Sequence, residues 1–254
     1  MKKMKVVSVN ISREKGTIKK PVDEISLYEH GIMEDAHAGD WNRMVSLLAK
    51  ESFERFAEYA GRMPDYGEFA ENITTEGISL HTLNLLDRLH INDAILEVTQ
   101  IGKKCHGDSC AIYREVGKCI MPTEGIFCRV VKSGNLKAGD NIILDKKVMK
   151  TLVITLSERA SKGIYSDRSG PGITKLLTAH WNNNQQPHEI ENILIGDDAE
   201  KLKKIIEKYR HETDFIFTTG GTGIGPKDIT TDTVKPLLDL EVPGIMDYIR
   251  LKYG

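Results

Sequence analysis

The sequence predicts a two-domain protein in which a β-rich first half precedes an α/β second half built on a parallel sheet. Up to about residue 144, short β-branched segments with partly alternating apolar residues are joined by polar loops, as expected of half-buried strands. A charged stretch follows at 145–150. After it, apolar segments alternate with amphipathic ones, which is typical of strands joined by crossover helices. We therefore expect domains at residues 1–146 and 150–254.

The composition is that of a globular protein and excludes several functional classes. With 28% charged residues and a formal net charge of -2, the chain lacks the basic excess of a general nucleic-acid binder. No run approaches the roughly 20 apolar residues that a membrane span needs. The N-terminal segment is too polar for a signal peptide. We expect a cytoplasmic protein with neither a nucleic-acid nor a membrane partner.

The first half is predicted to consist mainly of strands, interrupted by two helices. A turn-rich connection leads into the last strand, as is common where a small barrel changes direction. Apolar residues at near-helical spacing, with Gly61 as a C-terminal stop, predict one helix over 43–61. A short helix is expected over 81–89. The predicted strands cover residues 5–12, 94–101 and 125–134.

The second half alternates strands and helices. The continuous apolar segment 149–157 is typical of a strand buried on both faces of a parallel sheet. Leu202, Ile205, Ile206 and Tyr209 recur at helical spacing and predict an amphipathic helix. The other predicted strands cover 188–198 and 214–221, and the other helices cover 170–181, with Pro171 near the start, and 230–240.

A glycine-rich loop, TTGGTGIGPKDITTD over 218–232, follows the third strand of this half. Ligands of open parallel sheets bind at the carboxyl ends of the strands, where this loop lies. The P-loop pattern fails, because Pro226 precedes Lys227 and Asp228 replaces the Ser or Thr. The dinucleotide pattern G-x-G-x-x-G fails as well. A tight turn between strand and helix is the alternative to a ligand-holding loop.

Acidic residues at the same edge favour a magnesium nucleotide. A carboxylate at Asp228 is suited to hold Mg²⁺ against phosphate oxygens. Asp197 or Asp198 ends the preceding strand, and Ser157 ends the first one, so three neighbouring strand ends carry polar groups. The alternative for Asp198 and Asp232 is capping of a helix N-terminus.

Over residues 150–254 the chain resembles the molybdopterin-binding (molybdopterin adenylyltransferase) family, through LSERASKGIYSD, TTGGTGIGPKDITTD and EVPGIMDYIRLKYG. The resemblance implies Mg-ATP-dependent adenylylation of molybdopterin, and a trimeric homo-oligomer. It implies that Asp197 and Asp228 are the catalytic carboxylates, with magnesium at Asp228. The cofactor-binding positions that it implies are Ser157, Thr219, Gly220, Gly221, Thr222, Gly223 and Asp232.

The chain departs from this family at two places. Glu158 stands where the family usually has Asp, and the sequence ends at Gly254, before the last strand and helix of the family. We therefore expect a domain that lacks its last elements, with an open sheet edge and an uncovered face. The alternative to an active enzyme is a module that binds molybdopterin without catalysis.

All four cysteines lie between residues 105 and 128. Their spacing contains no C-x-x-C pair, which disfavours a zinc site. Cys128 and Cys119 are interpreted as core residues, and Cys110 as a partner of Cys105 or a loop residue. Cys105 lies beside Lys103, Lys104 and His106, and neighbouring positive charge favours a reactive thiolate that can bind molybdenum or carry sulfur.

From Lys5 to about Leu144 the chain resembles the MOSC domain, named for the C-terminal part of molybdenum cofactor sulfurase. The resemblance rests on the segments HGIMEDAHAGDWNRMVSLLA, GEFAENITTEG, EVTQIGKKCH, CIMPTEGIFCRV and LKAGD. The resemblance implies a β-rich barrel, and a Cys105 that ligates molybdenum or transfers sulfur. It implies a cofactor pocket formed by His37, Arg43, Ser46, Glu71 and Asn72.

Each pocket residue has a structural alternative. His37 could brace a loop, Ser46 could lie on the predicted helix, and Glu71 and Asn72 could be turn residues. Glu34 stands where the MOSC family often has glycine, so this turn is expected to differ. Pyridoxal phosphate, the cofactor of associated sulfurases, stays open, since the sequence identifies no Schiff-base lysine for it.

Together the two resemblances predict a protein of molybdenum cofactor biosynthesis or handling. Its expected ligands are molybdopterin and Mg-ATP, and other molybdenum cofactor enzymes are expected partners. In the alternative, only the MOSC half is active, as a sulfur carrier or a molybdenum oxidoreductase.

Overall fold

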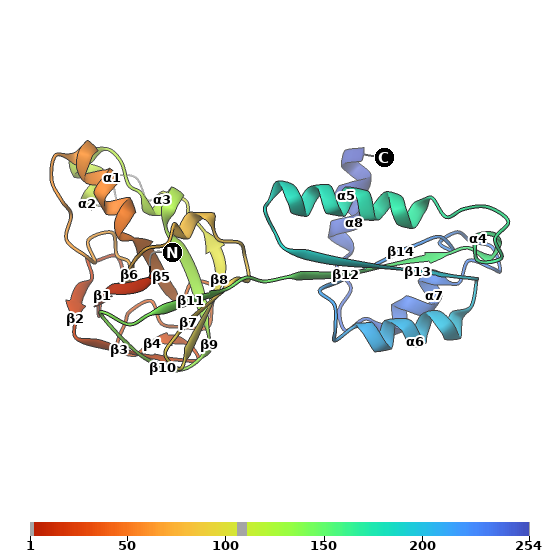
Figure 1. Cartoon of the computed structure of the whole chain (residues 1–254), viewed down its shortest axis with the longest axis horizontal. Helices are drawn as coiled ribbons and strands as arrows, with labels where there is room; N and C mark the ends of the chain where they lie inside the picture. Colours follow the sequence, from red (N-terminus) through yellow and green to blue (C-terminus); the bar gives the residue numbers. More distant parts are fainter. Residues whose placement is uncertain (1–2, 106–110, 254) are drawn as a thin grey trace. The chain divides into compact units, whose positions relative to one another are not determined.

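The computed structural model describes residues 3–105 and 111–253 (Figure 1). The chain forms two compact units that divide between Lys147 and Val148. None of the helices in the described ranges combines the length and apolarity that crossing a bilayer requires.

The first unit is built on a curved eight-stranded sheet with the order β11-β7-β8-β9-β5-β6-β1-β2. An isolated bridge between Lys5 and Asn141 joins β1 to the residue before β11, so the sheet curls into a half-barrel. Its strands are β1 (Lys5–Ile11), β2 (Lys20–Val22), β5 (Val45–Ala49), β6 (Ile73–Glu76), β7 (Arg88–Ile91), β8 (Ala94–Ile101), β9 (Ile126–Lys132) and β11 (Ile142–Asp145). A second, three-stranded sheet has the order β10-β3-β4, with β3 (Glu24–Tyr28), β4 (Gly31–Ile32) and β10 (Gly134–Lys137).

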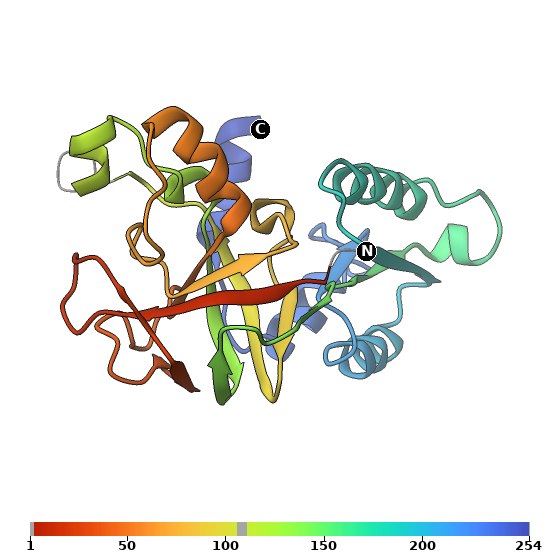
Figure 2. The same ribbon diagram turned by 60° about the vertical axis from the view of Figure 1, so that its left-hand side comes forward.

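Short helices gather at one end of the first unit (Figures 1 and 2). They are α1 (Lys50–Ala60), the 3₁₀ helix η1 (Leu80–Thr82), α2 (Ala111–Val116) and α3 (Met121–Glu124). Phe53 and Phe56 of α1 are buried against Phe69 in edge-to-face ring contacts. Gly61 ends α1 in the left-handed conformation, φ 71°, which confirms the predicted helix stop.

In this unit one predicted helix begins too early, and another is wrong. The predicted helix 43–61 is a strand followed by a helix, because residues 45–49 form β5 between β9 and β6. All five residues of β5 are buried, so the alternation of apolar and polar residues that identifies a half-exposed strand is absent. The spacing of the apolar residues is then compatible with a helix. The predicted helix 81–89 is replaced by η1 and the start of β7. The predicted strands at 5–12, 94–101 and 125–134 are confirmed as β1, β8 and β9.

The second unit has a parallel sheet of three strands in the order β13-β12-β14, which confirms the parallel sheet expected for this half. Helix α5 lies on one face, and α6 and α7 lie on the other (Figure 1). The elements are β12 (Met149–Leu156), α4 (Glu158–Ser161), α5 (Ser169–Asn183), β13 (His188–Ile195), α6 (Ala199–Tyr209), β14 (Phe215–Thr219), α7 (Thr230–Val234), the 3₁₀ helix η3 (Lys235–Leu237) and α8 (Pro243–Tyr253).

The core of the second unit lies on the α6 face of the central strand. Leu152, Leu156 and Ile154 of β12 pack against Leu202 and Ile206 of α6, which confirms the predicted amphipathic helix. The residues between them on β12 point to the α5 face, where the Thr155 hydroxyl donates to Asp167 at the start of α5. Helix α8 has no buried residue. Because β12 lies between β13 and β14, the carboxyl ends of all three strands meet at one edge.

Candidate functional site

The glycine loop begins where β14 ends, and its first residues must be glycine. Gly220 and Gly221 have φ of 89° and 59°, in the left-handed region. A Cβ on Gly220 would lie 2.1 Å from the carbonyl oxygen of Leu156, the last residue of β12. The loop therefore crosses the end of the central strand at backbone distance, which no other residue type permits.

Thr230 and Asp228 hold the loop from its far end. The hydroxyl of Thr230, a buried residue, donates to the Gly220 carbonyl at 2.8 Å, and its backbone N–H donates to the Gly221 carbonyl at 3.0 Å. Asp228 Oδ2 accepts from the Gly225 N–H at 2.9 Å. A Cβ on Gly223 would lie 2.6 Å from the same oxygen. The two anchors leave Thr222 and Gly223 exposed between them.

Ser157 and Glu158 follow the central strand and connect it to its neighbour. Ser157 Oγ accepts from the Ala160 N–H, which caps α4, and lies 2.7 Å from the Tyr165 hydroxyl. Glu158 Oε2 accepts from the Asp197 N–H at 3.4 Å. Hydrogen bonding to Lys162, then to the Asp197 backbone, lowers the pKa of Glu158. Glu158 therefore links the ends of β12 and β13.

The remaining predicted residues of this edge fall into different roles. Asp197 is half-buried just after β13, and Thr219 is the last residue of β14. Asp198 caps α6 by accepting from the Lys201 N–H, so the capping alternative is confirmed for it. Asp232 lies inside the first turn of α7, where Ile229 is the N-cap, so the same alternative was wrong there.

Asp167 belongs to this edge and was not assigned from the sequence. Its Oδ1 accepts from the Ser169 and Gly170 N–H groups at the start of α5, and its Oδ2 accepts from Thr155. A Cβ on Gly170 would lie 2.6 Å from Asp167 Oδ2. An aspartate two residues before Ser-Gly-Pro is a capping pattern that could have identified it.

In the first unit, Ser46, Glu71 and Asn72 lie together in a buried polar cluster. Ser46 lies on β5, so the alternative that it lies on a helix was wrong. Its hydroxyl donates to Asn72 Oδ1 at 2.9 Å, and its backbone N–H donates to the same oxygen. Asn72 Nδ2 donates to the carbonyl of Asn10 on β1. These bonds join three strands of the half-barrel.

Glu71 is completely buried, and its two carboxyl oxygens are in different situations. Oε1 accepts from the Gly67 N–H, from Thr74 at 3.0 Å and from Asn10 at 3.4 Å. Oε2 has no hydrogen-bond partner among residues 3–105 and 111–253. Burial raises the pKa of Glu71 to about 7, despite the donors on Oε1.

A buried ion pair that the sequence analysis missed lies beside His37. Lys19 Nζ is 2.5 Å from Asp35 Oδ2, and both side chains are excluded from solvent. Burial lowers the pKa of Lys19. The polar sequence around Lys19 did not predict that its side chain is buried. His37 is half-buried and lies in the loop after β4, with its ring stacked on Trp41 at 6.3 Å.

Arg43 lies in the loop before β5. Its guanidinium is 4.8 Å from the centre of the Trp41 ring and 5.8 Å from that of Phe127. Arg43 and His37 thus contact the same Trp41 ring, and Arg43 takes part in none of the ion pairs found among the described residues.

The cysteines occupy distinct environments. Cys105 is exposed beyond the end of β8, and Cys119 is half-buried against the aromatic cluster of α1. Cys128 is completely buried on β9, which confirms that it is a core residue, and burial raises the pKa of its thiol. Cys110 and His106 lie outside the described residues. Within the described ranges, no group of three or more His, Cys, Asp or Glu side chains is placed to bind a metal ion.

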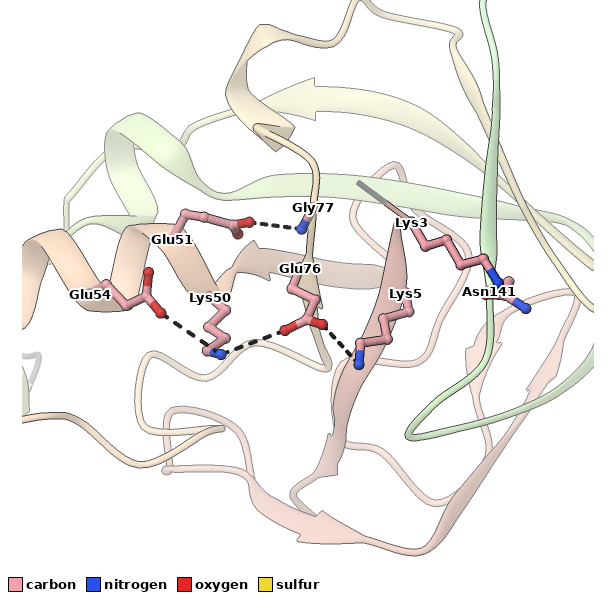
Figure 3. Close-up of a pocket in the computed structure, with 8 residues that line it drawn as sticks. All are labelled: Lys3, Lys5, Lys50, Glu51, Glu54, Glu76, Gly77 and Asn141. Atoms are coloured by element: carbon pink, nitrogen blue, oxygen red, sulfur yellow. Dashed lines mark hydrogen bonds and ion pairs between the residues drawn. The ribbon is translucent and has the colours of Figure 1, made fainter. Parts of the chain in front are cut away.

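A surface pocket of the first unit lies among residues that were not predicted as a site (Figure 3). Glu76 at its centre forms ion pairs with Lys5 at 2.9 Å and Lys50 at 3.5 Å, and Glu51 accepts from the Gly77 N–H at 2.7 Å. Its three lysines face three glutamates, so the pocket has no excess charge. Its lining residues are Lys3, Lys5, Lys50, Glu51, Glu54, Glu76, Gly77 and Asn141.

Two family models match the chain. The MOSC domain model matches residues 34–143, and the model of a probable molybdopterin binding domain matches residues 152–253. The chain is similar to the molybdopterin adenylyltransferase of Pyrococcus furiosus, with 38% identity over 96 residues, 38% of this chain and 54% of that protein. The Escherichia coli enzyme of the same name is 31% identical over 100 residues, 39% of this chain and 50% of that protein.

The chain thus spans about half the length of the curated relatives that it matches. Among solved structures, the YuaD protein from Bacillus subtilis matches with 19% identity and a TM-score of 0.48, covering 56% of this chain and 94% of that one.

Proposed function

Since the chain joins a MOSC domain to a probable molybdopterin-binding domain, we propose that it acts in the biosynthesis or handling of the molybdenum cofactor. The second unit binds molybdopterin and transfers AMP to it from Mg-ATP. The first unit binds the molybdenum cofactor or transfers its sulfur through Cys105. The observation that carries the proposal is the anchored glycine loop at the shared carboxyl edge of β12, β13 and β14.

The loop geometry supports binding of a phosphate. Two glycines in the left-handed conformation turn the backbone sharply at a strand end, and successive N–H groups in such a turn form an anion-binding concavity. Thr222 and Gly223 are exposed between the anchors, where a phosphate group can reach them. Ser157 and Thr219 supply hydroxyl groups from the two adjacent strand ends.

The donor set at this edge fits a magnesium ion that arrives with its nucleotide. One oxygen of Asp228 holds the loop, which leaves Oδ1 to face a ligand. Asp197 follows the neighbouring strand on the other side of β12. Carboxylate oxygens suit Mg²⁺, which commonly takes its other ligands from substrate phosphates and water. A site of this kind needs only a pair of carboxylates from the protein, and not a full set of protein ligands.

In this reaction the terminal phosphate oxygen of molybdopterin forms a bond to the α-phosphorus of ATP. The bond from that phosphorus to the bridging oxygen breaks, and pyrophosphate leaves. The protein contributes positioning of the two phosphates on the loop, and the metal would supply charge neutralisation. Glu158 keeps Asp197 in place by accepting its backbone N–H.

The first unit supplies a set of polar side chains and an exposed thiol. Arg43 and His37 present a positive charge and an imidazole that both contact Trp41, and Ser46, Glu71 and Asn72 form a buried hydrogen-bonded cluster. Cys105 is accessible, as a thiol must be to bind molybdenum or carry sulfur.

The proposal is tested by titrating the purified chain with molybdopterin, with and without Mg-ATP. We expect saturable binding that Gly220→Ala abolishes and Gly163→Ala retains, since the added Cβ meets backbone at 2.1 Å at Gly220 and meets nothing within 4 Å at Gly163. Binding without AMP transfer would favour the non-catalytic module. Absence of molybdopterin binding would contradict the proposal.

A further inference from the structure

The ring of His37 is held by a buried ion pair rather than by solvent alone. Lys19 Nζ lies 3.4 Å from His37 Nδ1, within hydrogen-bond distance. The same ammonium lies 2.5 Å from Asp35 Oδ2. Asp35 Oδ1 accepts from the backbone N–H of His37 at 3.0 Å, so the pair fixes both the backbone and the ring of this residue.

The geometry identifies the charge states of the pair. Asp35 accepts from three donors: Lys19, the His37 N–H and the Ser12 N–H, the last at 3.0 Å. An acceptor of three hydrogen bonds is a carboxylate, and a carboxylate without solvent needs a cation beside it. Burial raises the pKa of Asp35, but the hydrogen bond and charge of Lys19 outweigh it and lower the pKa. Lys19 is therefore the ammonium of this pair.

An ammonium group has no lone pair, so it can only donate. A hydrogen bond from Lys19 to His37 Nδ1 requires an unprotonated Nδ1, which places the ring proton on Nε2. We propose that Lys19, held by Asp35, is a positioning residue that keeps His37 neutral at physiological pH, with its proton on Nε2 as a hydrogen-bond donor. Its acceptor is an oxygen of an anionic ligand that Arg43, stacked on the same Trp41 ring, also binds.

The surroundings of His37 oppose a second positive charge. Among the described residues with the largest effects on the ring, Lys15, Lys19 and Lys103 disfavour an imidazolium and Asp35 favours one. On the other side, His37 stacks on Trp41, which also carries the guanidinium of Arg43. Burial, followed by the charge of Lys19, lowers the pKa of His37. The ring therefore stays neutral to a lower pH than an ordinary histidine does.

This inference rests on the proposed function only for the identity of the anion. A phosphate of a bound pterin and a free oxyanion offer the same acceptor oxygens. The state of the ring can be measured in the protein without any ligand, so failure of one proposal is distinguishable from failure of the other.

The test is nitrogen-15 NMR of the full chain labelled at histidine. The chain has eight histidines, and His37→Gln identifies the signal of His37 by its loss. Long-range nitrogen–proton correlations distinguish the two neutral tautomers and the imidazolium. We expect the pattern of the Nε2–H tautomer at neutral pH, and a titration midpoint below the ordinary value of histidine.

Two variants separate positioning from mere folding. Lys19→Met removes the donor, and Lys19→Met with Asp35→Asn removes both charges while keeping an amide oxygen for the backbone donors, which avoids a lone buried charge. In whichever of these folds, we expect the titration midpoint of His37 to rise and the Nδ1–H tautomer to appear. Lys20→Met, at the exposed neighbouring position on β2, should leave both unchanged. A wild-type His37 protonated on Nδ1, or a titration that the Lys19 variants do not move, would overturn the proposal.

Discussion

Asp228 Oδ2 accepts the backbone N–H of Gly225 at 2.9 Å, so the carboxylate proposed to face magnesium also closes the loop that precedes it. The two roles make different demands. An amide oxygen at this position can still accept from Gly225, but it contributes no negative charge toward a metal ion.

Asp228→Asn is therefore expected to keep molybdopterin binding and to lose AMP transfer by two orders of magnitude or more, about 3 kcal/mol. Asp228→Ala should weaken both. The measurements are molybdopterin titration and quantification of adenylylated molybdopterin. The control is Asp198→Ala, which removes the N-cap of α6 at a cost of about 1 kcal/mol of stability but should leave AMP transfer intact. Equal loss of binding in the Asn and Ala variants would contradict the division of roles.

Gly220 should tolerate no side chain. Its φ of 89° already disfavours other residues, and a Cβ would meet the Leu156 carbonyl, which belongs to the central strand and cannot move freely. Gly220→Ala is expected to destabilise the second unit by more than Gly163→Ala, where only the left-handed conformation costs roughly 1–2 kcal/mol. Chemical denaturation of both variants measures the difference. Equal destabilisation would show that the strand contact is absent in solution.

Glu71 should make the stability of the first unit pH-dependent. Because its pKa rises from 4.5 to about 7 on folding, the folded state binds a proton that the unfolded state has lost between these values. Stability therefore falls as the pH rises from 4.5 to 7, by about 3 kcal/mol, and is level above that range. Asp35, whose pKa is lowered, contributes stability that is lost only on acidification, as the pH falls from its unfolded pKa through its lower folded value.

Glu71→Gln removes this titration and keeps an oxygen for Gly67 and Thr74. Relative to wild type, the variant should gain stability between pH 4.5 and 7, as measured by denaturation across that range. Glu58→Gln, at an exposed position of α1, is the matched control and should follow wild type. A difference between Glu71→Gln and wild type that stays constant from pH 4.5 to 7 would show that folding does not raise the pKa of Glu71.

Cys105 and Cys128 should differ in reactivity. Cys105 is exposed, whereas Cys128 is completely buried with a raised pKa, so its thiolate is scarce and inaccessible. Brief alkylation of the folded chain at neutral pH, followed by peptide mass spectrometry, should modify Cys105 and spare Cys128. Cys105→Ser should abolish sulfur transfer and leave nucleotide binding unchanged. Sulfur transfer that survives this change would assign the chemistry to another thiol.

The sequence predicted the second unit better than the first, for physical reasons. Strands of a parallel sheet are continuously apolar and alternate with amphipathic helices, so residues 149–156 and 199–209 had clear patterns. In the half-barrel, β5 is buried on all sides and has no period, which is why its residues imitated a helix.

Side-chain partners were less predictable than strands. Lys19 and Asp35 are 16 positions apart, and only the tertiary fold buries them together beside His37. Glu71 and Asn72 were identified through a motif, but the environment of the Glu71 carboxyl group also depends on Asn10, which lies 61 positions away along the chain. The spacing of residues along the chain does not predict contacts between distant segments.

AMP transfer is the measurement that tests the central claim most directly. The purified chain is incubated with molybdopterin, Mg²⁺ and ATP labelled at the α-phosphorus, and the labelled pterin is separated and counted. We predict transfer of the label to molybdopterin in wild type, with release of pyrophosphate, and its loss in Asp228→Asn. Molybdopterin that binds but never receives the label would contradict adenylylation and leave the second unit as a binding module.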